Sequence, residues 1–262
     1  MRIMKNKIYY FSGTGNTLAL VKKLSDVVND FALIDIFQLD YKNKRIKIEG
    51  DRVGFVFPTY FANTPENIIE FLKQVDFGSV NYVFALMNGG GLFGTGLKTL
   101  RKILKKKGVK LNAGFTVKMP GNHPKIQELL KHTPEEYYKI ADEKMKLVTR
   151  KVKNKENHKI ETNWGIAGVF FTRIIFKKLQ GATARHEFGA RFIVDETCTN
   201  CEICEKSCPA GNIVNSGTKV EYLDRCLSCL RCYSICPEKS ITIDGVKDPE
   251  GRYIHPDFNI ND

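Results

Sequence analysis

The chain has 262 residues, of which 42% are hydrophobic and 27% are charged, as in a soluble globular protein. This length exceeds what one small core needs, so we expect two domains. No apolar run is long enough to cross a bilayer, and the apolar patch at residues 8–11 is too short for a signal peptide. We therefore expect a cytoplasmic protein without a membrane span.

The net charge of +12 is unevenly distributed. Residues 191–262 contain 8 Lys and Arg against 12 Asp and Glu, a formal charge of −4, so residues 1–190 carry +16. Such a basic balance raises nucleic acid as a partner. The basic runs at 101–110 and 144–159 come with no recognisable nucleic-acid-binding motif, however, and a solvated helix face explains them better. We expect no nucleic-acid partner.

Short apolar runs alternate with amphipathic stretches through the first half of the chain, which predicts a doubly wound α/β domain with a parallel sheet. The expected strands lie at 7–11, 32–36, 52–58, 81–88 and 110–119. The expected helices lie at 16–28, 65–75 and 96–108, followed by a basic helix at 134–159 and an apolar one at 164–179. The predicted units are an α/β domain at 1–160, a connecting helical segment at 161–190 and a small cysteine-rich domain at 191–262.

The stretch "FSGTGNT" at 11–17 joins the first expected strand to the first expected helix. Its two glycines permit a tight turn, and the helix N-terminus offers unpaired N–H groups, which together form an anion site. No lysine follows as in a Walker A loop, and Leu18 stands where a dinucleotide fingerprint has its third glycine. A hydroxyl-rich helix cap is the alternative interpretation. The candidate anion-binding residues are Ser12, Gly13, Thr14, Gly15, Asn16 and Thr17.

This loop resembles the FMN phosphate loop of the flavodoxins, Ser/Thr-x-Thr-Gly-x-Thr, at each fixed position. The resemblance implies a flavodoxin-like five-stranded sheet whose flavin ring lies at the loops after the third and fourth strands. Tyr60 or Phe61 would stack on one side of the ring and Phe93 on the other, although ordinary packing and turn roles also explain these residues. The implied ring contacts are Thr59, Tyr60, Phe61, Asn88, Gly89, Gly90 and Phe93, with Asn122 or His123 as further candidates.

The eight cysteines form two copies of C-x2-C-x2-C-x3-C-P, at 198–209 and 226–237. In a cytosolic chain such confined cysteines argue for metal or redox chemistry instead of disulfides. In the bacterial iron–sulfur run of this spacing, three thiolates bind one [4Fe–4S] cluster and the fourth binds the other. Structural zinc is the alternative, but it explains neither the third cysteine step nor the proline. The predicted sets are Cys198, Cys201, Cys204 and Cys236 for one cluster, and Cys226, Cys229, Cys232 and Cys208 for the other.

Residues 191–245 resemble the bacterial two-[4Fe–4S] ferredoxins, and the whole chain resembles the EFR1-family flavodoxin–ferredoxin fusion proteins of anaerobes. The resemblance implies a flavoprotein that transfers electrons between two clusters and FMN, and so couples one-electron to two-electron carriers. Alternatives are an FMN-dependent reductase of a small organic acceptor and a redox-responsive binding module. The basic domain would attract the acidic half of the chain or an external acidic ferredoxin.

Overall fold

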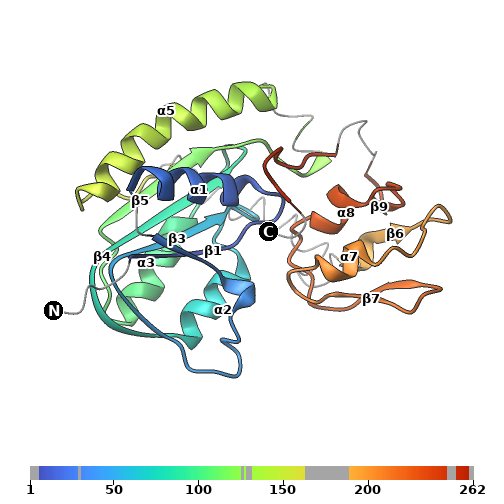
Figure 1. The fold of residues 1–262 in the computed structure, drawn as a ribbon, viewed down its shortest axis with the longest axis horizontal. Helices are drawn as coiled ribbons and strands as arrows, with labels where there is room; N and C mark the ends of the chain where they lie inside the picture. The colour runs from blue at the N-terminus through green and yellow to red at the C-terminus, as the bar shows by residue number, and fades with distance from the viewer. Residues whose placement is uncertain are drawn as a thin grey trace.

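The structure, a computed structural model, describes residues 6–28, 31–124, 127, 132–162, 189–246 and 252–259. Its first domain contains a five-stranded parallel sheet with the order β2-β1-β3-β4-β5 (Figure 1). This is the flavodoxin order of doubly wound folds, so the predicted flavodoxin-like sheet is confirmed. The strands are β1 (Asn6–Tyr10), β2 (Phe31–Asp35), β3 (Lys47–Pro58), β4 (Asp76–Gly89) and β5 (Ala113–Lys118).

Helices cover both faces of the sheet and enclose one apolar cluster on each side. On one face Leu24 of α1 and Val148 of α5 are fully buried, and on the other face Phe71 of α2 and Leu100 of α3 are. The sheet is therefore the middle of three layers, as alternating strands and helices require. The helices are α1 (Asn16–Val28), α2 (Glu66–Gln74), α3 (Gly96–Lys106) and α5 (Pro134–Lys153), and a 3-10 turn, η1 (Ile36–Gln38), follows β2.

Two strands extend further toward their N-termini than the apolar pattern predicts. β3 begins at Lys47 instead of residue 52, and β4 begins at Asp76 instead of residue 81. The added residues pair with each other, but many of their side chains are only half-buried, so they form no continuous apolar run. The basic helix predicted to reach residue 159 ends at Lys153, and Lys155 has a left-handed φ of 53° that a right-handed helix cannot continue through.

The cysteine-rich domain combines two short antiparallel ribbons with two short helices. Each ribbon pairs a strand of one cysteine copy with a strand of the other, β6 with β9 and β7 with β8. Ile213 and Ile241, which follow Cys208 and Cys236 at equal distance, begin β7 and β9 and are buried. The elements are β6 (Phe192–Val194), α7 (Ile203–Lys206), β7 (Ile213–Asn215), β8 (Val220–Tyr222), α8 (Arg231–Ile235) and β9 (Ile241–Ile243).

The second domain lies against the edge of the sheet where the parallel strands end (Figure 1). The segment 252–259 returns to that edge and contacts the loop between β1 and α1. The expected helix at 164–179 and most of the expected connecting segment 161–190 lie outside the described residues. No helix in the described ranges is both long enough and apolar enough to span a bilayer.

Candidate functional site

The loop between β1 and α1 is fixed by its own side chains. Ser12 Oγ accepts the N–H of Leu18 at 3.3 Å and so caps the start of α1. Thr17 Oγ1 accepts a hydrogen bond of 2.7 Å from Nδ2 of Asn88, which is buried at the end of β4. These residues meet because the carboxyl ends of parallel strands share one edge of the sheet, where such folds bind ligands.

The backbone of this loop leaves a group of N–H donors unused. Residues 12–17 are all buried, and within the described part of the chain the N–H groups of residues 13–17 donate to no protein acceptor. Buried N–H groups without an acceptor are costly, so such groups need a partner. Clustered N–H donors at a helix start suit an anion such as a phosphate.

The carbonyl groups of the same loop are bound from the other domain. Arg231 donates to the carbonyl oxygens of Ser12 and Gly13 at 2.6 and 2.8 Å. The N–H of His255 donates to the carbonyl oxygen of Thr14 at 2.9 Å. Because the C=O and N–H of a peptide unit point in opposite directions, these bonds leave the N–H groups facing away from the second domain's donors.

Both glycines of the loop are closely covered by neighbouring atoms. A Cβ atom at Gly13 would lie 2.6 Å from the hydroxyl oxygen of Tyr60. A Cβ atom at Gly15 would lie 2.7 Å from Cβ of His255 and from Cβ of Phe258, and Gly15 also has a φ of +96°. The turn and its cover thus both depend on glycine at these positions.

The loops after β3 and β4, where the flavin ring was predicted to bind, contact each other directly. The N–H of Thr95 donates to the carbonyl of Ala62 at 3.0 Å, and a Cβ atom at Gly89 would lie 2.5 Å from Cγ2 of Thr59. Phe93 is 3% exposed and packs in the core. The phosphate end of FMN therefore fits the donors of residues 13–17, whereas a ring between these loops requires them to separate.

Tyr60 stands between the phosphate loop and the second domain. Its ring packs edge-on against Phe11 with the centroids 5.9 Å apart. Burial raises the pKa of Tyr60 well above its usual range, and its hydroxyl has no hydrogen-bond partner among the described residues. The phenol is therefore neutral at physiological pH. Phe61, which follows it with a left-handed φ of 48°, lines a hollow next to Tyr60, and Gly90 is half-buried in the loop after β4.

Asn122, in the loop after β5, connects the phosphate loop to the second domain. Its Nδ2 donates to the carbonyl oxygen of Cys229 at 2.9 Å and lies 3.4 Å from Oγ1 of Thr14. The neighbouring His123 accepts the N–H of Gln127 with its carbonyl group at 3.0 Å.

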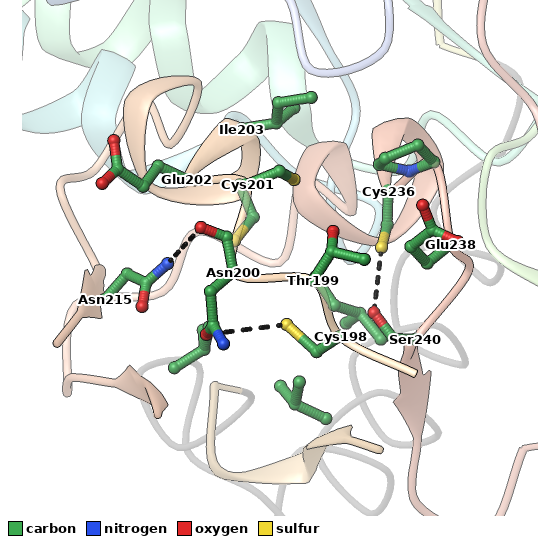
Figure 2. Close-up of a pocket in the computed structure, with 15 residues that line it drawn as sticks. Cys198, Thr199, Asn200, Cys201, Glu202, Ile203, Asn215, Cys236, Glu238 and Ser240 are labelled. Carbon is green, nitrogen blue, oxygen red and sulfur yellow. Dashed lines mark hydrogen bonds between the residues drawn. The ribbon is translucent and has the colours of Figure 1, made fainter. Parts of the chain in front are cut away.

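Four cysteines line one hollow in the cysteine-rich domain. They are Cys198, Cys201 and Cys204 of the first copy and Cys236 of the second. Figure 2 labels Cys198, Cys201 and Cys236 among the residues that line this hollow. The Ser240 hydroxyl lies 3.2 Å from Cys236 Sγ. Burial raises the pKa of the Cys204 thiol to about 11, so this sulfur ionises only beside a compensating cation, which iron would supply.

The other four cysteines form a second, more deeply buried group. Cys229 raises the pKa of the Cys226 and Cys232 thiols, and Cys208 of the first copy raises the pKa of the Cys226, Cys229 and Cys232 thiols. Burial raises the pKa of all three thiols, that of Cys226 to about 12. Sγ of Cys208 accepts the N–H of Asn212 at 3.2 Å. Each group thus combines three cysteines of one copy with the last cysteine of the other.

Both cysteine copies share an unusual backbone. Asn200 and Ser228, each just before the second cysteine, have φ values of 53° and 56°. Glu202 and Leu230, each just after the second cysteine, have φ values of 62° and 59°. Residues other than glycine seldom adopt this left-handed conformation. The repeated turns direct successive cysteines toward one centre, and the N–H of Ser228 reaches Sγ of Cys226 at 3.4 Å.

A second hollow lies at the junction between the domains. The hydroxyl of Tyr60, both amide atoms of Asn67 and the hydroxyl of Ser228 are buried there without partners among the described residues. Cys226 and Leu227 form its wall on the second domain. Polar groups from three segments are therefore available to a small molecule or water in this hollow.

Sequence reasoning missed the residues that join the two domains. Arg231 occupies the place of Ile203 in the first copy, and this difference between otherwise similar repeats is a signal that could have identified it. Tyr253 and His255 carry no comparable signal, because their role depends on where the segment 252–259 returns. Among the described residues no salt bridge connects the domains, and neutral or charge-assisted hydrogen bonds do so instead.

Residues 197–241 match the 4Fe-4S dicluster domain family. A comparison with curated proteins finds no match. Solved structures similar to this chain include the apo form of an NADH:FMN oxidoreductase (16% identity, TM-score 0.40, covering 60% of this chain and 91% of that one). They also include the two-electron reduced flavodoxin of Megasphaera elsdenii (18% identity, TM-score 0.34, 47% and 94% covered).

A third similar structure is a flavoprotein in complex with FMN from Lactobacillus acidophilus (14% identity, TM-score 0.32, 43% and 93% covered). At these scores the fold assignment rests on the strand order and not on the likeness. The chain is a flavodoxin-like domain followed by a small ferredoxin-like [4Fe–4S] domain.

Proposed function

We propose that this protein transfers electrons between two [4Fe–4S] clusters held by its second domain and an FMN held by its first. The observation that carries this proposal is the contact between the second cysteine copy and the phosphate loop, where Arg231 binds the carbonyls of Ser12 and Gly13. Bound FMN would supply a group that accepts one or two electrons, and each cluster one that carries single electrons. The pair would link one-electron to two-electron carriers, as in the EFR1-family fusion proteins that the sequence resembles.

The chain's own residues would hold these groups in separate but adjoining places. The N–H groups of residues 13–17 would bind the FMN phosphate, and the loops after β3 and β4 would part to admit the ring. Cys201 is exposed, whereas Cys229 is buried against the first domain. An external partner would therefore meet the cluster of Cys201, and the flavin would lie nearer the cluster of Cys229.

A second candidate function is the reduction of a small organic acceptor. The hollow at the domain junction favours it, because Tyr60, Asn67 and Ser228 offer unpartnered polar groups next to Cys226. Turnover of quinones or nitro compounds by the reduced protein, faster than by free FMN, supports this activity. Wild-type turnover in Asn67→Leu would exclude the hollow as the substrate site.

The partner we propose is an acidic ferredoxin that meets the basic first domain, in the reducing cytoplasm where thiolate-bound clusters persist. The two basic runs lie on opposite faces of the sheet, 101–110 at α3 and 144–159 at α5, so they do not form one patch. Electron-transfer rates that fall steeply with ionic strength support an electrostatic encounter. Rates independent of ionic strength exclude it.

The experiment that tests the proposed function is cofactor analysis of anaerobically purified protein. Iron, sulfide and acid-released flavin are measured per chain, together with spectra before and after dithionite. We expect about eight irons, about eight sulfides and one FMN per chain. Zinc in place of iron would refute the cluster assignment. Full iron without flavin, even after FMN is added, would leave a ferredoxin whose anion loop binds another phosphate.

A further inference from the structure

The two cysteine copies differ at the residue directly before their third cysteine. The first copy has Ile203 there, and its side chain lines the hollow of the first cysteine group. The second copy has Arg231, at the start of α8. At this position the second copy thus has a cation and the first copy an apolar residue.

Arg231 is held by carbonyl groups on both sides of the domain junction. Its Nη2 donates to Ser12 at 2.6 Å, its Nε to Gly13 at 2.8 Å, and its Nη1 to Ser207 at 3.1 Å. The guanidinium also lies over the ring of Phe258, 5.2 Å from its centroid. No described carboxylate forms a salt bridge with Arg231, although its positive charge also opposes the rise in the pKa of Asp35 that burial causes.

This charge acts on the second cysteine group. Arg231 is the second residue after Cys229 and directly precedes Cys232, and both of these cysteines are buried. Ser207, whose carbonyl it binds, directly precedes Cys208 of the same group. A fixed cation stabilises the more negative, reduced state of a nearby cluster, and net charge is one of the factors that set cluster potentials.

The same side chain also organises the anion loop. Two carbonyl oxygens of the loop accept from Arg231, and the opposite ends of those peptide units are the N–H groups of Gly13 and Thr14. Hydrogen bonding to a carbonyl polarises the peptide and strengthens its N–H as a donor. Arg231 therefore supports the anion site without touching the anion.

We propose that Arg231 is a positioning residue that raises the potential of the second cluster above that of the first and ties that cluster to the phosphate loop. This inference rests on the proposed function. On this inference electrons reach the cluster of Cys201 first and pass from the cluster of Cys229 to the flavin. In the step between them the first cluster is oxidised by one electron and the second reduced by one, and no bond or proton moves. An external one-electron donor protein supplies the electron.

The test compares three variants with the wild-type holoprotein: Arg231→Gln, Arg231→Lys and, as a control, Arg225→Gln. Arg225 is an exposed arginine that directly precedes Cys226, so its removal changes the charge of the same region in a screened position. The potential of each cluster is measured by redox titration followed by electron paramagnetic resonance. FMN affinity is measured by fluorescence.

We expect Arg231→Gln to lower the potential of the second cluster below that of the first and to leave the first unchanged. It also weakens FMN binding about tenfold, through the loss of two charge-assisted hydrogen bonds. Arg231→Lys keeps the positive charge, so the potential of the second cluster stays close to the wild-type value. Lysine cannot bind the carbonyls of Ser12 and Gly13 together as the guanidinium does, so FMN binding still weakens. Arg225→Gln changes neither property.

An equal shift of both clusters in Arg231→Gln, or no shift, overturns the proposal, and so does an equal effect of Arg225→Gln. Cofactor analysis of each variant separates this result from failure of the proposed function. Two clusters without any FMN would disprove the flavin assignment while the order of the potentials still decides the role of Arg231. Fewer than two clusters in the wild-type protein would overturn both the proposed function and the role proposed for Arg231.

Discussion

The hydroxyl of Tyr253 donates a hydrogen bond of 2.5 Å to Oδ1 of Asn16, and so connects the last described segment to the first helix of the chain. The same hydroxyl lies 3.0 Å from that of Tyr138 on α5, and Asn16 uses its Nδ2 to bind the carbonyl of Pro120 at 2.9 Å. Residues from both ends of the sequence thereby fix one side of the anion loop. The segment 252–259, which covers this loop, is therefore fixed to the first domain by hydrogen bonds. We call this segment the cover.

Replacing Tyr253 by Phe should destabilise the protein and loosen this cover. Oδ1 of Asn16 would remain buried without a donor, which costs about 1–3 kcal/mol of unfolding free energy. Chemical unfolding of the anaerobic holoprotein measures this loss. Tyr138→Phe is the matched control, because it removes a neighbouring hydroxyl but leaves the bond between Tyr253 and Asn16 intact. Equal losses in the two variants would mean that the bond to Asn16 has no special role.

Replacing Gly15 by Ala tests the cover in a different way. The new Cβ would lie 2.7 Å from Cβ of both His255 and Phe258, so the segment 252–259 must move. Gly217→Ala is the control for backbone strain alone, since its φ of +83° is also left-handed but nothing lies within 4 Å of its Cβ position. That strain is about 1–2 kcal/mol at either site. We expect rapid proteolysis after residue 246 in Gly15→Ala only, and equal proteolysis of both variants would contradict this.

Much of the first domain could be predicted from periodicity. The predicted helix at 16–28 coincides with α1, and the strand order follows the flavodoxin order that the loop at 11–17 implied. The first residues of β3 and β4 were missed because they pair through backbone hydrogen bonds while their side chains stay partly exposed. An apolar pattern reports burial, so it cannot reveal strand pairing that leaves most of the paired side chains partly exposed.

Only those parts of the candidate site that are formed by continuous sequence motifs could be predicted from the sequence. The cysteine runs and the loop at 12–17 are continuous motifs, so their residues could be named from the sequence. Arg231 and His255 act on that loop from more than 200 positions away, and no local pattern encodes such a contact. The closeness of Thr59 to Gly89 was equally hidden, because it depends on how two loops pack.

Lowering the pH should weaken the packing of the segment 252–259 on the first domain, because His255 becomes protonated. Burial lowers the pKa of His255 below 6.5, and the charge of Lys23 adds to this effect while that of Asp257 opposes it. The ring also packs on Tyr138, and its Nδ1 accepts the N–H of Asp257 at 3.2 Å, which requires that nitrogen to be unprotonated. The folded state therefore binds fewer protons than the unfolded state. The contribution of His255 to stability is complete above pH 6.5 and is lost as pH falls through the lower pKa of the folded state.

The measurement is the thermal midpoint of wild type and His255→Asn between about pH 5 and pH 8, the range in which histidine titrates. Asparagine offers an acceptor to the N–H of Asp257 but does not titrate. Below pH 6.5 the wild-type midpoint should fall more steeply than that of the variant. Parallel curves would show that His255 does not carry this dependence, whatever other groups titrate in the same range.

The crossed cysteine groups make a prediction that separates them from two independent motifs. Cys236 lines the hollow of Cys198, Cys201 and Cys204, although it belongs to the other copy. Cys236→Ser and Cys201→Ser should therefore each lose the same cluster and leave the same remaining resonance spectrum. Cys208→Ser and Cys226→Ser should each lose the second cluster and leave the resonance spectrum of the first. In each variant about four of the eight irons remain. If Cys236→Ser instead matches Cys226→Ser, each motif binds its own cluster and the crossed assignment is wrong.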